Sequence, residues 1–207
     1  EKTVCVETDA QLRDGIFYLP NKTKPFSGKN LCKYENGQIK QEGSYKDGKL
    51  NGKWTSWYEN GQMEYETNYK DGKEDGIWTF WDKNGQIDSK GNYKDGKLIG
   101  ETKYSYYDNG QIMSEINYKD GKLNGKWTRL DENGQIDLEG NYKDGKEDGK
   151  WIQWDENGQK REEGNYKDGE KHGKLTYYEN GQKEVEANFK DGKLDGKMTR
   201  WHENGQK

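Results

Sequence analysis

The side chains able to support acid–base or metal chemistry are either few or repetitive in this sequence. The two histidines, His172 and His202, are isolated, with no cysteine or second histidine at metal-ligand spacing. Carboxylates are abundant, but they recur in every repeat of the sequence, whereas a catalytic pair is set apart from its copies by its environment. We therefore expect no enzyme, no metal site and no cofactor.

Tryptophan and tyrosine recur at fixed positions, and aromatic rings can pack on one another or present a binding surface. The simplest explanation is that these rings pack together to hold a thin sheet, while a ladder spaced by about 10 Å for stacking on sugar rings is the alternative. The candidate binding face consists of Tyr45, Trp57, Tyr69, Trp81, Tyr93, Tyr106, Tyr118, Tyr142, Trp154, Tyr166, Tyr177 and Trp201.

A second periodic set is acidic and lies directly before each Asn-Gly pair, where only Lys83 departs from the pattern. The candidate acidic edge consists of Glu35, Glu59, Asp108, Glu132, Glu156, Glu179 and Glu203. The formal charges of the six-residue segments that begin at each Lys-Asp-Gly sum to only +1, so the opposite edge of the sheet is nearly neutral. This arrangement favours a basic or mixed protein partner over nucleic acid or lipid, although solubility alone also explains it.

Cys5 and Cys32 are the only cysteines and permit one disulfide. Cys32 falls in a column that is mostly polar in later copies, so we expect it to face solvent. A bridge to Cys5 would close a loop of about 28 residues, contribute on the order of 3 kcal/mol and imply an oxidising compartment. The sequence leaves bridged and free thiols open.

These side chains are placed by a repeat. Asn-Gly recurs at Asn36, Asn60, Asn84, Asn109, Asn133, Asn157, Asn180 and Asn204, with periods of 24, 24, 25, 24, 24, 23 and 24 residues. An Asp-Gly follows each of the first seven at a constant interval of 11 residues, and another glycine follows four residues after that. The one-residue insertion lies between Gly100 and Asn109 and the deletion between Gly173 and Asn180, which we interpret as strand bulges.

Asn-Gly and Asp-Gly between short aromatic or β-branched runs predict hairpin turns. A three-residue loop with Gly61 left-handed would place Trp57, Met63, Tyr65 and Tyr69 on one face of the sheet. Hairpins that contact only their neighbours predict an open, solenoid-like sheet. At about 10 Å per repeat, eight copies would extend about 75 Å.

Composition limits the fold to a thin structure, because only 27% of residues are apolar and 36% are charged. The aromatic content argues against disorder. We predict an all-β protein built as a single-layer, elongated, twisted antiparallel sheet. Residues 1–27 form a cap with short strands, and residues 28–207 form tandem 24-residue β-hairpins.

The string Gly43-Ser-Tyr-Lys-Asp-Gly48-Lys-Leu-Asn-Gly52 resembles the MORN repeat, and the match recurs in all seven copies. With Glu59-Asn-Gly-Gln62 between copies, the chain is similar to the bacterial variant that is often labelled an antitoxin component of a toxin–antitoxin system. The first glycine is replaced at Thr67, Ile116 and Ala187. The resemblance implies tandem hairpins in one sheet, used for protein contact or for scaffolding at membranes.

We expect a non-enzymatic scaffold that mediates protein–protein interaction in a bacterium, possible settings being the cell surface or an antitoxin-like pairing. A cell-surface glycan-binding module is the alternative. A secreted, periplasmic or cell-surface location is favoured over the cytoplasm. Neither nucleic-acid binding nor direct membrane insertion is expected, since the formal net charge is −4 and the longest apolar run is the four residues from Ile16 to Leu19.

Overall fold

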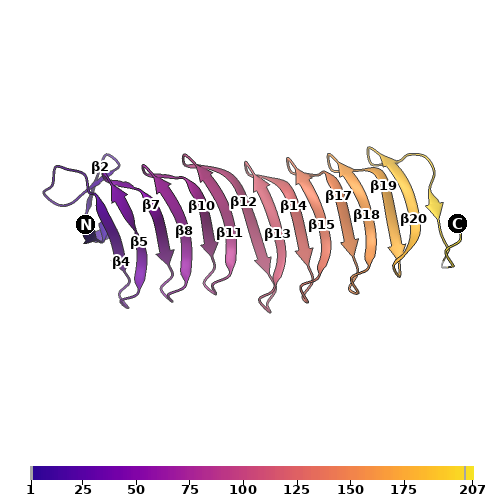
Figure 1. The fold of residues 1–207 in the computed structure, drawn as a ribbon, viewed down its shortest axis with the longest axis horizontal. Coiled ribbons are helices and arrows are strands. Elements are labelled where there is room, and N and C mark those ends of the chain that lie inside the picture. The colour runs from indigo at the N-terminus through magenta and orange to yellow at the C-terminus, as the bar shows by residue number, and fades with distance from the viewer. Residues whose placement is uncertain (1, 203) are drawn as a thin grey trace. The chain divides into compact units, whose positions relative to one another are not determined.

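The computed structural model describes residues 2–202 and 204–207. The described chain is nearly all β-structure, and its contacts separate it into two units that divide between Glu101 and Thr102. This boundary differs from the predicted one between a cap of residues 1–27 and repeats from residue 28, which stays a prediction. In each unit, the strands run side by side in chain order, with the Asn-Gly turns along one edge and the Asp-Gly turns along the other (Figure 1).

The first unit contains the N-terminal segment and the first hairpins. Its elements are β1 (Thr3–Val4), α1 (Val6–Asp9), β2 (Gln11–Arg13), β3 (Ile16–Tyr18), β4 (Gly28–Lys33), β5 (Ile39–Lys46), β6 (Lys49–Leu50), β7 (Gly52–Trp57), β8 (Met63–Lys70), β9 (Lys73–Glu74), β10 (Gly76–Trp81) and β11 (Ile87–Lys94). Strand β12 (Lys97–Tyr106) continues the chain into the second unit.

The second unit repeats the hairpin without a cap-like segment. Its remaining elements are β13 (Ile112–Lys119), β14 (Lys122–Leu130), β15 (Ile136–Lys143), β16 (Lys146–Glu147), β17 (Gly149–Trp154), β18 (Lys160–Lys167), β19 (Glu170–Glu179), β20 (Gln182–Lys190), β21 (Lys193–Leu194) and β22 (Thr199–Arg200).

The Asp-Gly pairs make two-residue turns because both residues adopt positive φ. Asp47 has φ 50° and Gly48 has φ 74°, and the flanking Lys46 and Lys49 pair across the turn. The Asn-Gly turns are one residue longer: Gly61 has φ 84°, and the backbone N–H of Tyr58 donates to the carbonyl of Gln62. The three-residue loop with a left-handed Gly61 is thus confirmed.

The deletion after Gly173 shortens the turn of its hairpin. Asn180 and Gly181 both have positive φ, and Glu179 pairs with Gln182, so this turn has only two residues. A register shift precedes the Asn-Gly turn in ordinary copies too, for example between Ser56 and Trp57. The bulge is therefore a general feature of the repeat, which the copy with the deletion keeps between Tyr177 and Tyr178, so the deletion is not marked by it. A bulge at the insertion between Gly100 and Asn109 stays a prediction.

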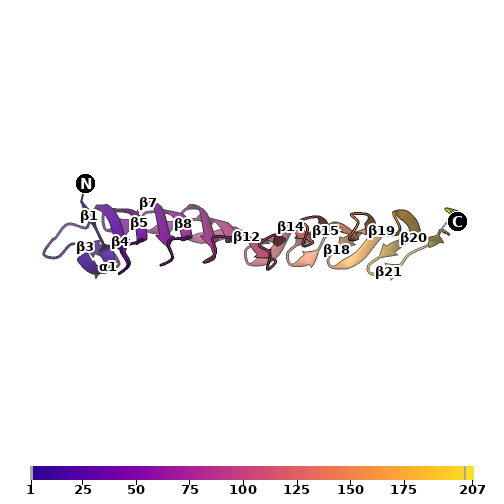
Figure 2. The same cartoon turned by 90° about the horizontal axis from the view of Figure 1, so that it is seen from below.

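The N-terminal segment covers one edge of β4. Strand β1 pairs with β4 in parallel, an exception to the antiparallel pairing of the hairpins. Figure 2 shows α1 and β3 beside β4 at this end of the first unit. Val4, Val6 and Phe26 are buried there with Tyr45 and Trp54, which makes this the best-developed hydrophobic cluster among the described residues.

Cys5 and Cys32 are joined by a disulfide that ties the N-terminal segment to β4. The side chain of Cys32 is 1% exposed, so the expectation that it faces solvent was wrong. The column is buried in other copies as well, since the equivalent Ser56 and Thr176 are 7% and 2% exposed, and at Cys32 the bonded segment that carries Cys5 adds further cover. Buried Asn30, next to it, accepts a hydrogen bond from the backbone N–H of Val6 (2.8 Å).

The predicted fold class is confirmed: an all-β protein of tandem hairpins in an open, single-layer sheet. The predicted elongation of the complete chain stays a prediction, which solution scattering would test against the radius of gyration of about 17 Å expected for a compact domain of this length. Within the described residues, no helix is long and apolar enough to cross a membrane.

Candidate binding surface

The two faces of the sheet carry different side chains, and the bulge decides which residues lie on which face. In β7 and β8, Trp54 pairs with Thr67 and Ser56 with Tyr65, whereas Trp57 pairs with Met63. Residue 64 is the extra one, so the alternation shifts there, and Trp57 and Met63 lie on the opposite face from Tyr65. The prediction that Trp57, Met63, Tyr65 and Tyr69 share one face was wrong, because it did not include this bulge.

We call the face that carries Trp54 the aromatic face and the face that carries Trp57 the ladder face. The twelve predicted aromatics divide between them. Those on the aromatic face are Tyr45, Tyr69, Tyr93, Tyr118, Tyr142, Tyr166 and Tyr177, and those on the ladder face are Trp57, Trp81, Tyr106, Trp154 and Trp201. A single continuous binding face made of all twelve does not exist.

The aromatic face is held together by a tryptophan column that sequence reasoning missed. Two residues after the second glycine of a repeat stand Trp54, Trp78, Trp127 and Trp151, followed by Leu175. Their rings contact the tyrosine column: Trp54 lies 6.0 Å from Tyr45 and Trp151 lies 5.3 Å from Tyr142, both edge-on. The signal for this column is its constant spacing from the second glycine of the repeat, rather than from the Asn-Gly or Asp-Gly pair.

The first glycine of the repeat makes room for these rings. A Cβ atom added at Gly43 or Gly140 would overlap the indole of Trp54 or Trp151, respectively. Burial on this face raises the pKa of the Tyr45 phenol to about 12, so Tyr45 stays neutral at physiological pH. The aromatic face is therefore committed mainly to packing, which is the simpler of the two expectations for the aromatic columns.

The ladder face is lined by ion pairs between adjacent strands. The pairs are Lys53–Glu66 (2.8 Å), Lys126–Glu139 (2.8 Å), Lys150–Glu163 (3.4 Å) and Lys174–Glu186 (3.0 Å). Each lysine follows the second glycine of its repeat, and each glutamate stands five residues before an Asp-Gly. Such exposed pairs contribute little to stability, about 0–1 kcal/mol each, but they leave these rungs of the face neutral.

Beside the ion pairs runs a row of partly exposed apolar pairs. Trp57 pairs with Met63, Trp81 with Ile87 and Leu130 with Ile136. A hollow of about 530 Å³ in the first unit is lined by Trp57 and Met63 together with the Lys53–Glu66 rung. Farther along, lysine replaces the aliphatic partner, in Trp154–Lys160 and Tyr178–Lys183.

Two consecutive rungs depart from the Lys–Glu pattern: the later one has Glu101 and Glu115, and the earlier one exposes an apolar group. At the positions of Lys53 and Glu66, the next repeat has Ile77 and Lys90. The Ile77 side chain is 66% exposed, and Lys90 is exposed and makes no ion pair with any described residue. This rung therefore presents an uncovered apolar group and an uncompensated positive charge, where the ordinary rungs present a neutral pair.

Glu163 is the most strongly stabilised carboxylate of the ladder face. It accepts hydrogen bonds from Lys160 (2.8 Å) and from the Tyr178 hydroxyl (2.6 Å), and it also pairs with Lys150. These contacts lower the pKa of the Glu163 carboxyl to about 2. The arrangement is a local structural brace, because both lysines are satisfied by the same carboxylate.

The predicted acidic edge lies in the Asn-Gly turns, and its described members are exposed. Glu203 lies outside the described residues. Six of the turns are of two kinds, set by the residue two places before the asparagine. Where that residue is Tyr34, Tyr58 or Tyr107, its hydroxyl donates to a backbone carbonyl of the next hairpin. Where it is Asp82, Asp131 or Asp155, its carboxylate accepts two backbone N–H groups of its own turn.

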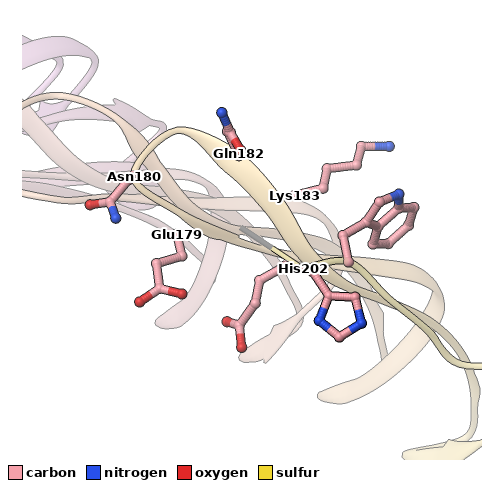
Figure 3. A pocket seen from close by; sticks show the side chains of 7 residues that line it. Glu179, Asn180, Gln182, Lys183 and His202 are labelled. Carbon is pink, nitrogen blue, oxygen red and sulfur yellow. The ribbon is translucent and has the colours of Figure 1, made fainter. Parts of the chain in front are cut away.

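A second hollow of about 440 Å³ lies at the C-terminal end of the second unit. Figure 3 shows Glu179, Asn180, Gln182 and Lys183 from the β19–β20 turn beside His202. Its lining is polar, and the Lys183 ammonium lies 5.9 Å from the centre of the Trp201 ring. The described residues that line it include one histidine and no cysteine, serine or threonine.

Cys5, Glu7 and Cys32 bring possible ligand atoms within 4.8 Å of one another. The two sulfur atoms are bonded to each other, however, so they do not offer thiolates to a metal ion. Glu7 instead pairs with Lys40 at 2.7 Å. The other histidine, His172, lies 3.7 Å from Asp191 through its Nδ1 atom.

Comparison with known families decides the identity of the repeat. A model described as "MORN repeat variant" matches residues 27–47, 50–71, 74–95, 102–120, 123–144, 147–168 and 171–191. The chain belongs to the MORN repeat family. Members of this family are generally non-enzymatic repeat scaffolds that bind proteins or membranes. The matched segments cover the described hairpins from β4 to β20.

Other comparisons add little to the MORN assignment. No curated protein matches the chain. Among solved structures, the chain is similar to one described as "Crystal structure of GtfA/B complex bound to UDP and GlcNAc", at 14% identity and a TM-score of 0.23, over 50% of this chain and 20% of that one. A likeness at that score carries no argument about fold or function.

Proposed function

We propose that this MORN repeat protein is a non-enzymatic scaffold that binds another protein through the ladder face of its first unit. The observation that carries the proposal is the Ile77–Lys90 rung. Interface centres are enriched in aromatic and other large apolar side chains, surrounded by a polar rim that excludes water. Trp57, Ile77 and Trp81 provide the apolar anchors, and the Lys53–Glu66 pair provides such a rim.

The contrast between the faces supports the choice of the ladder face. On the aromatic face, Trp54 and Trp78 are each 6% exposed and already packed against neighbouring rings. On the ladder face, Trp57 and Trp81 each have one aliphatic partner and remain half-buried. Of these four tryptophans of the first unit, only Trp57 and Trp81 have apolar area left to bury against a partner.

The charges indicate the chemistry of that partner. Lys90 has no counter-ion among the described residues, so a partner that places a carboxylate beside an apolar side chain fits the Ile77–Lys90 rung. The carboxylates of the acidic edge would speed the encounter with a partner that also carries basic groups. Glycan stacking has weaker support, because Trp57 and Trp81 are each paired with an aliphatic side chain of the opposite strand.

The test starts with a photo-crosslinking residue at Ile77, and with a control residue at Leu12, which is exposed in the N-terminal segment. Crosslinking in the native source identifies a candidate partner, which is then purified for affinity measurement. The decisive variant is Ile77→Lys with Lys90→Glu, which turns the exceptional rung into an ordinary one. We expect this variant to keep its stability and to lose at least tenfold in affinity, since a central anchor typically contributes more than 1 kcal/mol.

The matched control is the charge swap Lys53→Glu with Glu66→Lys, which keeps an ordinary rung and is expected to retain binding. Equal affinity of wild type and the Ile77→Lys, Lys90→Glu variant would refute the proposed site. Signal on a glycan array that disappears in Trp57→Ala with Trp81→Ala would establish the glycan-binding alternative instead.

We also propose that the protein works outside the cytoplasm, in keeping with its disulfide. The proposed location is a bacterial cell surface or periplasm, and the proposed partners include a toxin in an antitoxin-like pairing. Alkylation and intact-mass measurement of protein purified from its native source test the location. Two freely alkylated thiols would contradict it.

A further inference from the structure

The Asn-Gly turns contain a chemical difference that the repeat itself hides. Asparagine followed by glycine can cyclise, because the backbone nitrogen of the glycine attacks the side-chain amide carbon. The new C–N bond forms a succinimide, and ammonia leaves. Water then opens the ring to give aspartate or isoaspartate, so a neutral amide becomes a carboxylate. In this chain, every such turn has the same local sequence, Asn-Gly-Gln.

Among the turns at Asn36, Asn60, Asn84, Asn109, Asn133 and Asn157, we call those with a tyrosine two places before the asparagine tyrosine-type, and those with an aspartate there aspartate-type. In the tyrosine-type turns, both the oxygen and the nitrogen of the asparagine side-chain amide are hydrogen-bonded. The Asn60 carbonyl oxygen accepts the backbone N–H of Gln62 (3.0 Å), and its amide nitrogen donates to the Lys83 carbonyl of the next hairpin (2.9 Å). Asn36 and Asn109 make the equivalent two bonds. A held amide must break both bonds before its carbon can approach the glycine nitrogen.

In the aspartate-type turns, the aspartate replaces the asparagine as the acceptor. The Asp82 carboxylate accepts the backbone N–H groups of both Asn84 and Gln86 (2.9 Å each). The Asn84 side chain makes no hydrogen bond with any described residue, and it is exposed. Asn133 and Asn157 are in the same situation, behind Asp131 and Asp155.

The attacking nitrogen does not distinguish the two kinds of turn. The Gly61 N–H donates to the Tyr58 carbonyl at 2.9 Å, and the Gly85 N–H donates to the Asp82 carbonyl at 3.0 Å. Both glycines also have φ of 84°. The difference between the turns therefore lies in the freedom of the asparagine amide to rotate into contact with the glycine nitrogen, the near-attack geometry that the reaction requires.

We infer that Asn84, Asn133 and Asn157 are selective sites of spontaneous deamidation in the folded protein, while Asn36, Asn60 and Asn109 are protected. Loss of two net-favourable hydrogen bonds predicts a rate difference on the order of tenfold. Each event adds a negative charge to the acidic edge, beside Lys83, Glu132 or Glu156. An isoaspartate also lengthens the backbone of the turn by one carbon.

The experiment incubates the full chain at mildly alkaline pH and follows each Asn-Gly peptide by mass spectrometry. The three free asparagines are expected to react first, with the protected three about tenfold slower. The same incubation in denaturant is the control, since the local sequences are nearly identical and the rates should then converge. Equal rates in the folded protein, or faster reaction at Asn36, Asn60 and Asn109, would overturn the inference.

Two variants separate amide anchoring from general mobility of the turn. Asp82→Ala removes the competing acceptor, so Asn84 is expected to bond to the Gln86 N–H and to react more slowly. Tyr58→Phe removes the bond from the Tyr58 hydroxyl to the Trp81 carbonyl but leaves the Asn60 amide anchored, so the Asn60 rate should not change. Faster reaction at Asn60 in Tyr58→Phe, or at Asn84 in Asp82→Ala, would mean that turn mobility sets the rates and would reject the inference.

Discussion

The two faces of this sheet carry similar aromatic residues and use them differently. Strand β10 shows the contrast within three residues: Trp78 lies on the aromatic face and is 6% exposed, while Trp81 lies on the ladder face and is half-buried. Trp78 contacts the rings of Phe80 and Tyr93 on its own face. Trp81 pairs with one aliphatic side chain, Ile87. Residue type alone does not separate packing from presentation, because the neighbours decide it.

Glycine is the main cause of the difference. On the aromatic face, glycine opposite the tryptophan lets the ring lie flat against the strand, and the tyrosine column covers the ring. On the ladder face, the corresponding neighbours are lysine and glutamate, whose charged ends stay in water. A single-layer sheet can therefore have a packed face and a face available for binding, although it has no second layer.

The largest test of this contrast compares Trp78→Ala with Trp81→Ala. We expect Trp78→Ala to lower the free energy of unfolding by about 3–5 kcal/mol, as for other buried tryptophans, and Trp81→Ala to lower it by about 1 kcal/mol. Urea denaturation followed by circular dichroism measures both. Similar losses for the two variants would show that the two tryptophans contribute equally to packing and would contradict the contrast between the faces.

The next test removes the covalent closure at the end of the aromatic face. Replacing Cys5 and Cys32 together by serine is expected to lower the free energy of unfolding by about 3 kcal/mol, because the unfolded chain regains the freedom of a loop of this length. Chemical denaturation of the variant beside the oxidised wild type measures the loss. A difference near zero would mean that the N-terminal segment stays in place without its covalent link.

A smaller effect is expected from the glycine that accommodates the ring. Gly43→Ala forces the indole of Trp54 to move, and overpacking of this kind costs about 1–3 kcal/mol. Its neighbour Ser44 points to the other face, so Ser44→Ala serves as the control, with an expected change below about 0.5 kcal/mol. Equal stability of Gly43→Ala and wild type would remove glycine as the cause of the contrast.

The smallest effect concerns an ion pair of the ladder face. The Glu163 carboxyl has its pKa lowered to about 2 by Lys160 and Tyr178, so its contribution is present above about pH 4.5 and is lost as the pH falls toward 2. Because the group is partly exposed, Glu163→Gln should cost about 1 kcal/mol at neutral pH. Unfolding of both proteins between pH 7 and pH 3 should show this difference shrinking. A difference that stays constant with pH would contradict the assignment.

The repeat made the hairpins, the turn types and the tyrosine column predictable. Gly61 and the Asp-Gly pairs were read correctly because few residues other than glycine, asparagine and aspartate tolerate positive φ. The assignment of faces failed because the bulge next to Trp57 reverses the alternation without changing the sequence interval. The burial of Cys32 was not predicted because the polar residue types of its column were taken to mean exposure, whereas the equivalent Ser56 and Thr176 are buried.

The Ile77–Lys90 rung has a consequence for how a partner finds its place. A surface that repeats every 24 residues offers equivalent positions, so a partner that recognised only Lys–Glu rungs could bind at several offsets along the chain. In such a complex, the partner would have no single register along the repeats. The rung that carries Ile77, with its exposed apolar side chain, gives the surface a fixed reference position for the partner's other contacts.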